Sequence, residues 1–210
     1  MLRQLDLFNI IDFLLKIPVV LWAISFHEFC HGYAAKLLGD RTAEMQGRLT
    51  LNPIKHFDPI GVLMLFFAGF GWAKPVPVNS RYFKNVRRDI VIVSLAGIAG
   101  NLLTAFVFAL IGKLLVSNIA PSYAFGRAMY FINAMIFINV SLAAFNILPI
   151  PPLDGSKILY SFIPFKWLRF YYSLEQYGMY ILLIMVFTNT IQFIMTPIMF
   201  FFLRLIGAFG

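Results

Sequence analysis

The sequence predicts an all-α polytopic membrane protein, with about four to six transmembrane or re-entrant helical segments and a small membrane-associated β element. Of its 210 residues, 60% are hydrophobic and 12% are charged, whereas soluble domains average about 45–50% apolar and 25% charged residues. Three apolar stretches, 89–112, 128–149 and 178–206, approach or exceed the length that crosses a bilayer, roughly 18–20 residues. Short connections with polar residues, glycine and proline separate these stretches.

The N-terminal region predicts two helical segments. Residues 5–16 place apolar and charged side chains at helical spacing, which fits a segment lying in the membrane interface better than a span. Pro18 then opens an apolar helix over 18–38, and Gly39 and Asp40 follow its end.

The region after this helix predicts the small β element. Residues 47–52 alternate polar and apolar side chains and stop at Pro53, as a short strand would. Residues 74–79 are expected to be extended, because their prolines are tolerated mainly at strand edges. Between them, the apolar segment 58–72 is short and contains several glycines, which is compatible with a re-entrant hairpin.

Two long helices are expected next. In the helix 89–112, Ala96 and Gly100 are small residues four positions apart, a spacing that allows close helix contact in lipid. The helix 128–149 ends in a run of prolines that begins at Pro149, because proline cannot continue a helix.

The C-terminal stretch 178–206 is interrupted by polar residues around Asn189 and by Pro197, so it is either one bent span or a hairpin. The sequence has no internal repeat and no low-complexity tract. We therefore expect one integral-membrane domain over 1–210, without a separate soluble domain.

The net charge of +8 comes mostly from short connections between apolar segments. The connections 36–55, 74–88 and 157–169 hold 12 of the 17 Lys and Arg residues. This distribution is typical of the positive-inside rule, so we expect a multi-pass protein of the cell membrane rather than a nucleic-acid partner. The single cysteine, Cys30, excludes an intrachain disulfide framework and a Cys-rich zinc site.

The helix 18–38 contains a motif typical of metallohydrolases, His27-Glu-Phe-Cys-His31. His27 and His31 are four residues apart, so they stand one turn apart on the same face and can bind one metal ion. Glu28 is rotated by roughly 100° from His27, which places it beside the metal, where it can contact a bound water. The alternative is a chance match, which the cost of ionisable residues inside a span disfavours.

Two histidines leave a catalytic zinc short of one protein ligand, because such sites usually take three and leave the fourth position to water. Asp154 is the candidate that stands out, since it follows a proline-broken helix end and precedes Gly155. A role as the N-cap of a short helix over 155–163 is the alternative.

Together, His27-Glu-Phe-Cys-His31 and Asn146-Ile-Leu-Pro-Ile-Pro-Pro-Leu-Asp154-Gly155 resemble the paired signature of site-2 proteases, the intramembrane zinc metalloproteases, in their short prokaryotic form. The segments 52–61 and 71–78 also resemble parts of that subgroup. One departure is Ile98, which stands where the family often has proline before an asparagine. The resemblance implies a zinc ion held by His27, His31 and Asp154, with Glu28 as the general base.

Three further residues have open roles. Asn146 is a candidate donor to the oxyanion, or a buried amide that bonds a neighbouring helix. His56 is a candidate transition-state donor or extra ligand, or a residue that stabilises a turn. Cys30 is expected to be a small packing residue.

The resulting hypothesis is hydrolysis of peptide bonds of membrane proteins within or near the bilayer. A transmembrane protein or peptide would be the substrate and the lipid bilayer the other partner, and the extended segments would hold the unwound substrate by strand addition. A metal-binding transporter and a catalytically silent scaffold are the alternatives. The ligand types favour zinc, with other divalent ions also compatible.

The metal hypothesis also predicts topology. The histidines lie past the middle of the helix 18–38 and Asp154 lies beyond the end of the helix 128–149, so these two helices must run in the same direction. The segment 58–72 must then turn back instead of crossing. In this arrangement the basic connections share the cytoplasmic face, and the active site lies nearer that face.

Overall fold

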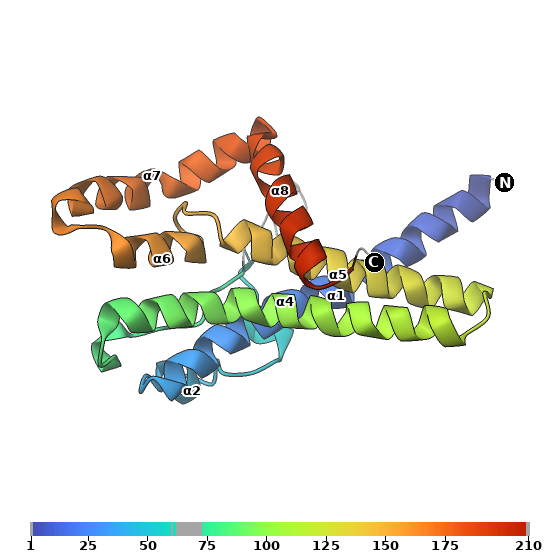
Figure 1. Ribbon diagram of the computed structural model, residues 1–210, viewed down its shortest axis with the longest axis horizontal. Coiled ribbons are helices and arrows are strands. Elements are labelled where there is room, and N and C mark those ends of the chain that lie inside the picture. Colours follow the sequence, from blue (N-terminus) through green and yellow to red (C-terminus); the bar gives the residue numbers. More distant parts are fainter. Residues whose placement is uncertain (1, 60, 62–72, 209–210) are drawn as a thin grey trace.

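The computed structural model describes residues 2–59, 61 and 73–208, and for residues 2–13 it describes the backbone alone. The described chain is predominantly helical (Figure 1). Its elements are α1 (Leu2–Leu37), α2 (Thr42–Met45), η1 (Pro53–His56), η2 (Ser80–Tyr82), α4 (Val86–Asn118), α5 (Tyr123–Asn146), α6 (Asp154–Phe162), η3 (Phe165–Trp167), α7 (Leu168–Phe187) and α8 (Thr190–Leu205).

Three described helical segments are long and apolar enough to cross a membrane: Leu14–Leu37, Val86–Asn118 and Tyr123–Asn146. The bent pair α7 and α8 adds a fourth if it counts as one broken span. The predicted all-α polytopic class is therefore confirmed.

The helices α1, α4 and α5 form the centre of the molecule. α4 and α5 lie antiparallel, and α1 packs against both (Figure 1). α1 and α5 run in the same direction, as the metal hypothesis requires. Close packing of α1 on α4 depends on small residues, because a Cβ added at Gly100 would lie only 2.5 Å from Cys30 Sγ. Cys30 is therefore a packing residue, as predicted.

The expectation of two separate N-terminal segments is wrong. α1 continues through Pro18 from Leu2 to Leu37, so 5–16 and 18–38 belong to one helix. Proline removes one backbone hydrogen bond from a helix, but membrane helices tolerate it where the surroundings satisfy the freed groups. The predicted C-terminal end is confirmed, since Gly39 follows with a positive φ of 107°.

The predicted β element is not found among the described residues, which contain only an isolated bridge between Phe57 and Ala73. Residues 47–52 continue the turn that ends α2, because the N–H groups of Arg48 and Leu49 both donate to the carbonyl of Ala43. The alternating pattern was therefore misleading. Residues 74–79 are irregular in structure, as their prolines allow. The expected hairpin 58–72 lies outside the described residues except for 58, 59 and 61.

The C-terminal helices bend where the sequence is polar. α7 ends at Phe187, Asn189 adopts a left-handed conformation with φ of 57°, and α8 begins at Thr190. The two helices meet at 87°. The interruption predicted around Asn189 is confirmed, whereas Pro197 lies inside α8.

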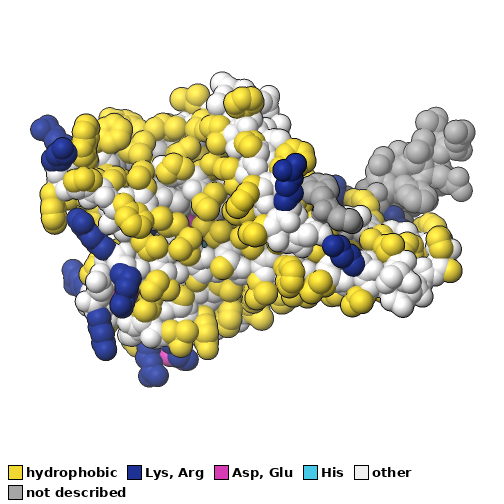
Figure 2. Space-filling model, in the orientation of Figure 1, with side chains coloured by type: hydrophobic (Ala, Val, Ile, Leu, Met, Phe, Trp, Pro, Cys, Tyr) yellow, Lys and Arg dark blue, Asp and Glu magenta, His cyan; other side chains and the backbone are white. Residues whose placement is uncertain are grey.

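Charge and apolar surface are segregated. Figure 2 shows hydrophobic side chains across most of the visible face, while Lys and Arg side chains gather at the end that holds α2, the start of α4 and the turn from α6 into α7. Such segregation suits a molecule whose sides face lipid and whose end faces water.

Candidate metal centre

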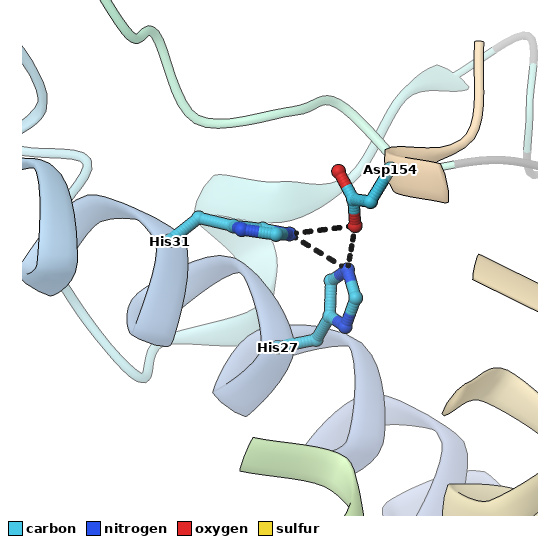
Figure 3. Close-up of side chains that lie close together, drawn as sticks. All are labelled: His27, His31 and Asp154. Carbon is cyan, nitrogen blue, oxygen red and sulfur yellow. Dashed lines mark hydrogen bonds and ion pairs between the residues drawn. The ribbon is translucent and has the colours of Figure 1, made fainter. Parts of the chain in front are cut away.

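Two histidines and one aspartate meet inside the molecule (Figure 3). His27 and His31 lie one turn apart on α1, and their Nε2 atoms are 2.9 Å apart. Asp154 Oδ2 lies 3.1 Å from His27 Nε2 and 3.0 Å from His31 Nε2. All three side chains are buried. The structure therefore brings together the three residues that the resemblance implies as metal ligands.

The outer nitrogen of each imidazole has a partner of its own. His31 Nδ1 donates to the carbonyl oxygen of Val93 at 2.7 Å. His27 Nδ1 donates to Asn101 Oδ1, also at 2.7 Å. Because these oxygens only accept, each neutral ring carries its proton on Nδ1 and directs the lone pair of Nε2 toward Asp154. Nε2 of both histidines and Oδ2 of Asp154 thus converge as three acceptor atoms with no hydrogen-bond donor between them. A cation bound between these atoms makes the arrangement favourable.

The cluster fits zinc in ligand type and in size. Two imidazoles and a carboxylate form a known ligand set of catalytic zinc, and the fourth position is left for water. Metal–ligand distances of about 2.0–2.1 Å correspond to separations of about 3.3 Å between the ligands of a tetrahedron. The three separations here, 2.9, 3.0 and 3.1 Å, are close to that value.

Asp154 reaches the histidines because the chain turns tightly between α5 and α6. A Cβ added at Gly155 would collide with the carbonyl oxygens of Ile147 and Leu148, so only glycine allows this approach. The alternative role of Asp154 as an N-cap is wrong, because Leu153 occupies that position and Asp154 is the first residue of α6.

α4 approaches the histidines equally closely. A Cβ at Gly97 would collide with His31 Nε2 and would lie 2.8 Å from His27 Cε1. The absence of a side chain at Gly97 therefore leaves room for both rings. The expectation that small residues on this helix allow close contact is confirmed, and at Gly97 that contact is with the metal centre itself.

Asn101, one turn after Gly97, belongs to a chain of buried amides. Its Nδ2 donates to the carbonyl of Ala23 at 3.0 Å and to Asn139 Oδ1 at 2.9 Å. These two acceptors fix the orientation of the Asn101 amide, so that its Oδ1 faces His27. Asn139 in turn donates to the carbonyl of Met135 at 2.8 Å. Three helices thus contribute to the orientation of one histidine.

A cavity of about 710 Å³ lies beside the cluster. Its lining includes the three cluster residues, Glu28 and Asn146. Glu28 Oε2 accepts a hydrogen bond from the backbone N–H of Val76 at 2.7 Å. The segment 74–79 therefore orients this carboxylate within the cavity that holds the metal cluster.

The remaining candidates are placed differently. Asn146 lines the cavity, and its Nδ2 donates to the carbonyl of Leu142 within the same helix at 3.0 Å. His56 is buried in η1, where Nε2 donates to the carbonyl of Thr50 at 2.8 Å, and it is not among the described residues that line the cavity. The turn-stabilising alternative therefore describes His56 better than a role at the metal.

Two partners of the proposed ligands were not predicted from the sequence. Asn101 was given no role at the metal, although it lies one helical turn from Gly97 and therefore on the same face. Lys157, three residues after Asp154, places Nζ 2.9 Å from Asp154 Oδ1. This leaves Oδ2 of the same carboxylate to face the histidines. The spacing of three residues between Asp154 and Lys157 could have indicated this ion pair, because residues three apart on a helix are neighbours.

Comparisons with known proteins agree with this geometry. The model of peptidase family M50 matches residues 115–188, a range that includes Asp154. The chain is 40% identical over 185 residues to the protein named "Putative zinc metalloprotease YwhC" of Bacillus subtilis, covering 86% of this chain and 84% of that protein. It is 30% identical over 186 residues to "Putative zinc metalloprotease Rip2" of Mycolicibacterium smegmatis, covering 86% of this chain and 69% of the relative. No solved structure gives a significant match.

Neither alternative function gains support. A transport pathway needs metal-binding groups in successive layers, whereas the described residues contain one cluster of potential metal ligands. The relatives are named as metalloproteases, which also disfavours a silent scaffold. The chain belongs to peptidase family M50, the site-2 proteases, and is a multi-pass intramembrane zinc metalloprotease.

Proposed function

We propose that this protease hydrolyses peptide bonds of transmembrane protein substrates, with His27, His31 and Asp154 as its zinc ligands and Glu28 as its general base. One observation carries the proposal: three buried acceptor atoms converge at 2.9–3.1 Å in the lining of a cavity that also contains Glu28. When bound, zinc would lower the pKa of water and polarise the scissile carbonyl.

Glu28 is suited to the proton transfers. Its Oε2 is held by the N–H of Val76, so the carboxylate has a fixed direction while Oε1 remains available. Glu28 would accept a proton from the attacking water and pass it to the leaving amine. Asn146 is a candidate hydrogen-bond donor to the developing oxyanion. One N–H of its amide donates to the carbonyl of Leu142, and the second N–H is not used by that bond.

The segment 74–79 is a candidate for holding the substrate. A helical substrate hides its carbonyls in hydrogen bonds, so it must unwind before attack, and an unwound strand can bond to an exposed backbone. Pro75, Val76 and Val78 line the cavity. The segment is anchored at both ends, since Arg48 donates to the carbonyl of Lys74 and the N–H of Asn79 donates to Asp40. Residues 47–52 do not line the cavity, so we assign them no role in binding.

The charge distribution supports a location in the cell membrane with the active site nearer the cytoplasm. The connections 36–55, 74–88 and 157–169 carry 12 of the 17 Lys and Arg residues, and Figure 2 shows basic side chains gathered at the end where these connections lie. Lys and Arg are retained on the cytoplasmic side of membrane proteins.

A topology label tests this orientation. A single cysteine placed at Arg81 in a Cys30→Ser background is expected to react with a membrane-impermeant reagent only after the cytoplasmic face is opened. A cysteine at Arg127, near the start of α5 and at the other end of the molecule, is the control and should react from the outside. Labelling of position 81 in sealed right-side-out vesicles would reverse the proposed orientation.

Substitution of the general base tests the chemistry. Glu28→Gln preserves size and removes basicity, so we expect near-normal zinc content and a loss of cleavage of at least roughly 10²-fold, the lower end for general acid–base catalysis. The assay is hydrolysis of a helix-destabilised transmembrane peptide in liposomes, with metal analysis of both proteins and a chelator control. Full activity of Glu28→Gln would refute the assigned role.

A further inference from the structure

Among the acidic side chains that the structure describes, one lacks a partner. Six of the seven accept a hydrogen bond or form an ion pair: Glu28, Asp40, Glu44, Asp58, Asp89 and Asp154. The seventh, Glu175 on α7, has neither an ion pair nor a hydrogen bond within the described part of the chain, and it is exposed. Ionisable residues inside membrane spans are costly and usually functional, and α7 belongs to the bent pair that is long and apolar enough to form one broken span.

Glu175 lies on the face of α7 that borders the active-site cavity. Tyr171, Glu175, Met179 and Leu182 all line this cavity. Their spacing of four, four and three residues places them along one side of the helix. The other members of this stripe are aromatic or apolar, so Glu175 is its one charged group.

Within the described part of the chain, the cavity lining offers no free Lys or Arg side chain to neutralise Glu175. Among the described Lys and Arg side chains, Lys157 alone lines the cavity, and its Nζ is 2.9 Å from Asp154 Oδ1. Lys157 therefore serves the metal ligand. Glu175 is left as an accessible negative charge in the space that a substrate must occupy.

We propose that Glu175 is a specificity-determining residue that binds a lysine or arginine side chain of the substrate close to the scissile bond. This inference rests on the proposed function. The surrounding end of the molecule is strongly basic, so a cationic substrate residue would be repelled unless a local carboxylate received it. Transmembrane substrates carry such residues at their cytoplasmic ends. An ion pair with Glu175 would then select substrates by charge and fix their position along the cavity.

The test uses a set of single-span peptides that differ at one position. Lys, Gln or Glu is placed in turn at each of several positions around the cleaved bond, and kcat/KM is measured in liposomes. For the wild type we expect Lys to exceed Gln by about fivefold at one position, and Gln to exceed Glu similarly, as for a partly exposed ion pair. The preference should shrink at high salt, which screens exposed charges.

Two variants and one matched control assign the preference. Glu175→Gln is expected to cleave the three peptides within about twofold of one another, and Glu175→Lys to prefer Glu over Lys. Glu44→Gln makes the same change in net charge at the same basic end, outside the cavity, and should keep the wild-type preference. An unchanged preference in Glu175→Gln, or no preference in the wild type at any position, would overturn the inference.

Binding separates this inference from the proposed function. In a Glu28→Gln background, the dissociation constants of fluorescent Lys and Glu peptides are compared with and without Glu175→Gln. A Lys preference that disappears with Glu175→Gln supports the subsite even if the wild type cleaves none of the peptides, a result that would count against the proposed protease substrate alone. Equal affinities for the two peptides with Glu175 intact would contradict the subsite, whatever the cleavage data show.

Discussion

The two sides of the active-site cavity are built in opposite ways. On the side formed by α1, α4 and the start of α6, the proposed ligands His27, His31 and Asp154 each have a further partner that fixes their direction. On the side formed by α7, Glu175 has no hydrogen bond or ion pair within the described chain, and among the other helices α7 contacts mainly its neighbours α8 and η3.

The first side therefore suits the chemical step, and the second side suits recognition of the substrate. Zinc ligands must be held in one geometry, so their outer hydrogen bonds and close glycine contacts are part of the site. A surface that recognises varied substrates gains from groups that are left unpaired until the substrate arrives, because the substrate then supplies the missing partner. Substitutions on the first side should therefore change metal binding, and those on the second should change substrate preference.

The largest expected effect is on the ligand side. Asp154→Ala removes one of the three proposed ligands, so purified protein should retain well below the roughly one zinc per chain expected of the wild type. Cleavage should fall with the metal. Asn146→Ala is the matched comparison in the same segment: it should keep its zinc and lose roughly 10²–10³ in kcat, the effect of removing one oxyanion donor.

Metal analysis of the three proteins, purified in parallel, separates these outcomes. Equal zinc in the wild type and Asp154→Ala would remove Asp154 from the ligand set. Loss of zinc from Asn146→Ala would show that Asn146 supports the metal centre instead of the oxyanion.

The histidine pair could be predicted from the sequence because its chemistry is local: His27 and His31 lie four residues apart on one helix. For Asp154, residue type and position left an N-cap role open, and its place in the ligand set rested on the resemblance to site-2 proteases. The apolar helices could also be predicted, because their length and composition are set by the bilayer. The bend at Asn189 was also visible, since polar residues interrupt an apolar run there.

Tertiary context could not be read in the same way. Residues 47–52 alternate like a strand, but their backbone N–H groups bond back to α2. Pro18 reads as a helix start, yet α1 continues through it, because long apolar helices tolerate proline. Asn101 was not linked to the metal site, since its contact with His27 spans 74 positions in sequence. Glu175 had no recognisable motif at all.

Gly97 tests how closely the ligand side is packed. Gly97→Ala places a Cβ against both histidine rings, so we expect zinc affinity to fall by more than roughly 100-fold, beyond the usual cost of losing an outer hydrogen bond. Gly126→Ala on α5 is the control, because a Cβ there meets nothing within 4 Å. Competition with a chromophoric chelator gives both affinities. Wild-type zinc affinity in Gly97→Ala would show that the helices shift easily to admit a methyl group.

The smallest expected effect concerns the amides that orient His27. Asn101→Ala removes the acceptor for His27 Nδ1, so zinc affinity should fall by about 10–100-fold, as for other outer partners of metal ligands. Asn139 does not contact the histidine, and it acts by holding the amide of Asn101 in one orientation. Asn139→Ala should therefore weaken zinc binding by less than Asn101→Ala.

The double variant Asn101→Ala/Asn139→Ala tests whether Asn139 affects zinc binding only through Asn101. If Asn139 works only through Asn101, its substitution has no further effect once Asn101 is alanine, and the two losses of zinc affinity will not add. Additive losses would instead indicate that each amide stabilises the helix bundle separately. The thermal unfolding midpoint of the metal-free proteins provides the control, since a purely structural role lowers it in proportion to the loss of affinity. We expect the zinc-dependent rise in that midpoint to shrink in Asn101→Ala more than the metal-free midpoint itself falls, because the amide pair orients a ligand as well as joining α4 to α5.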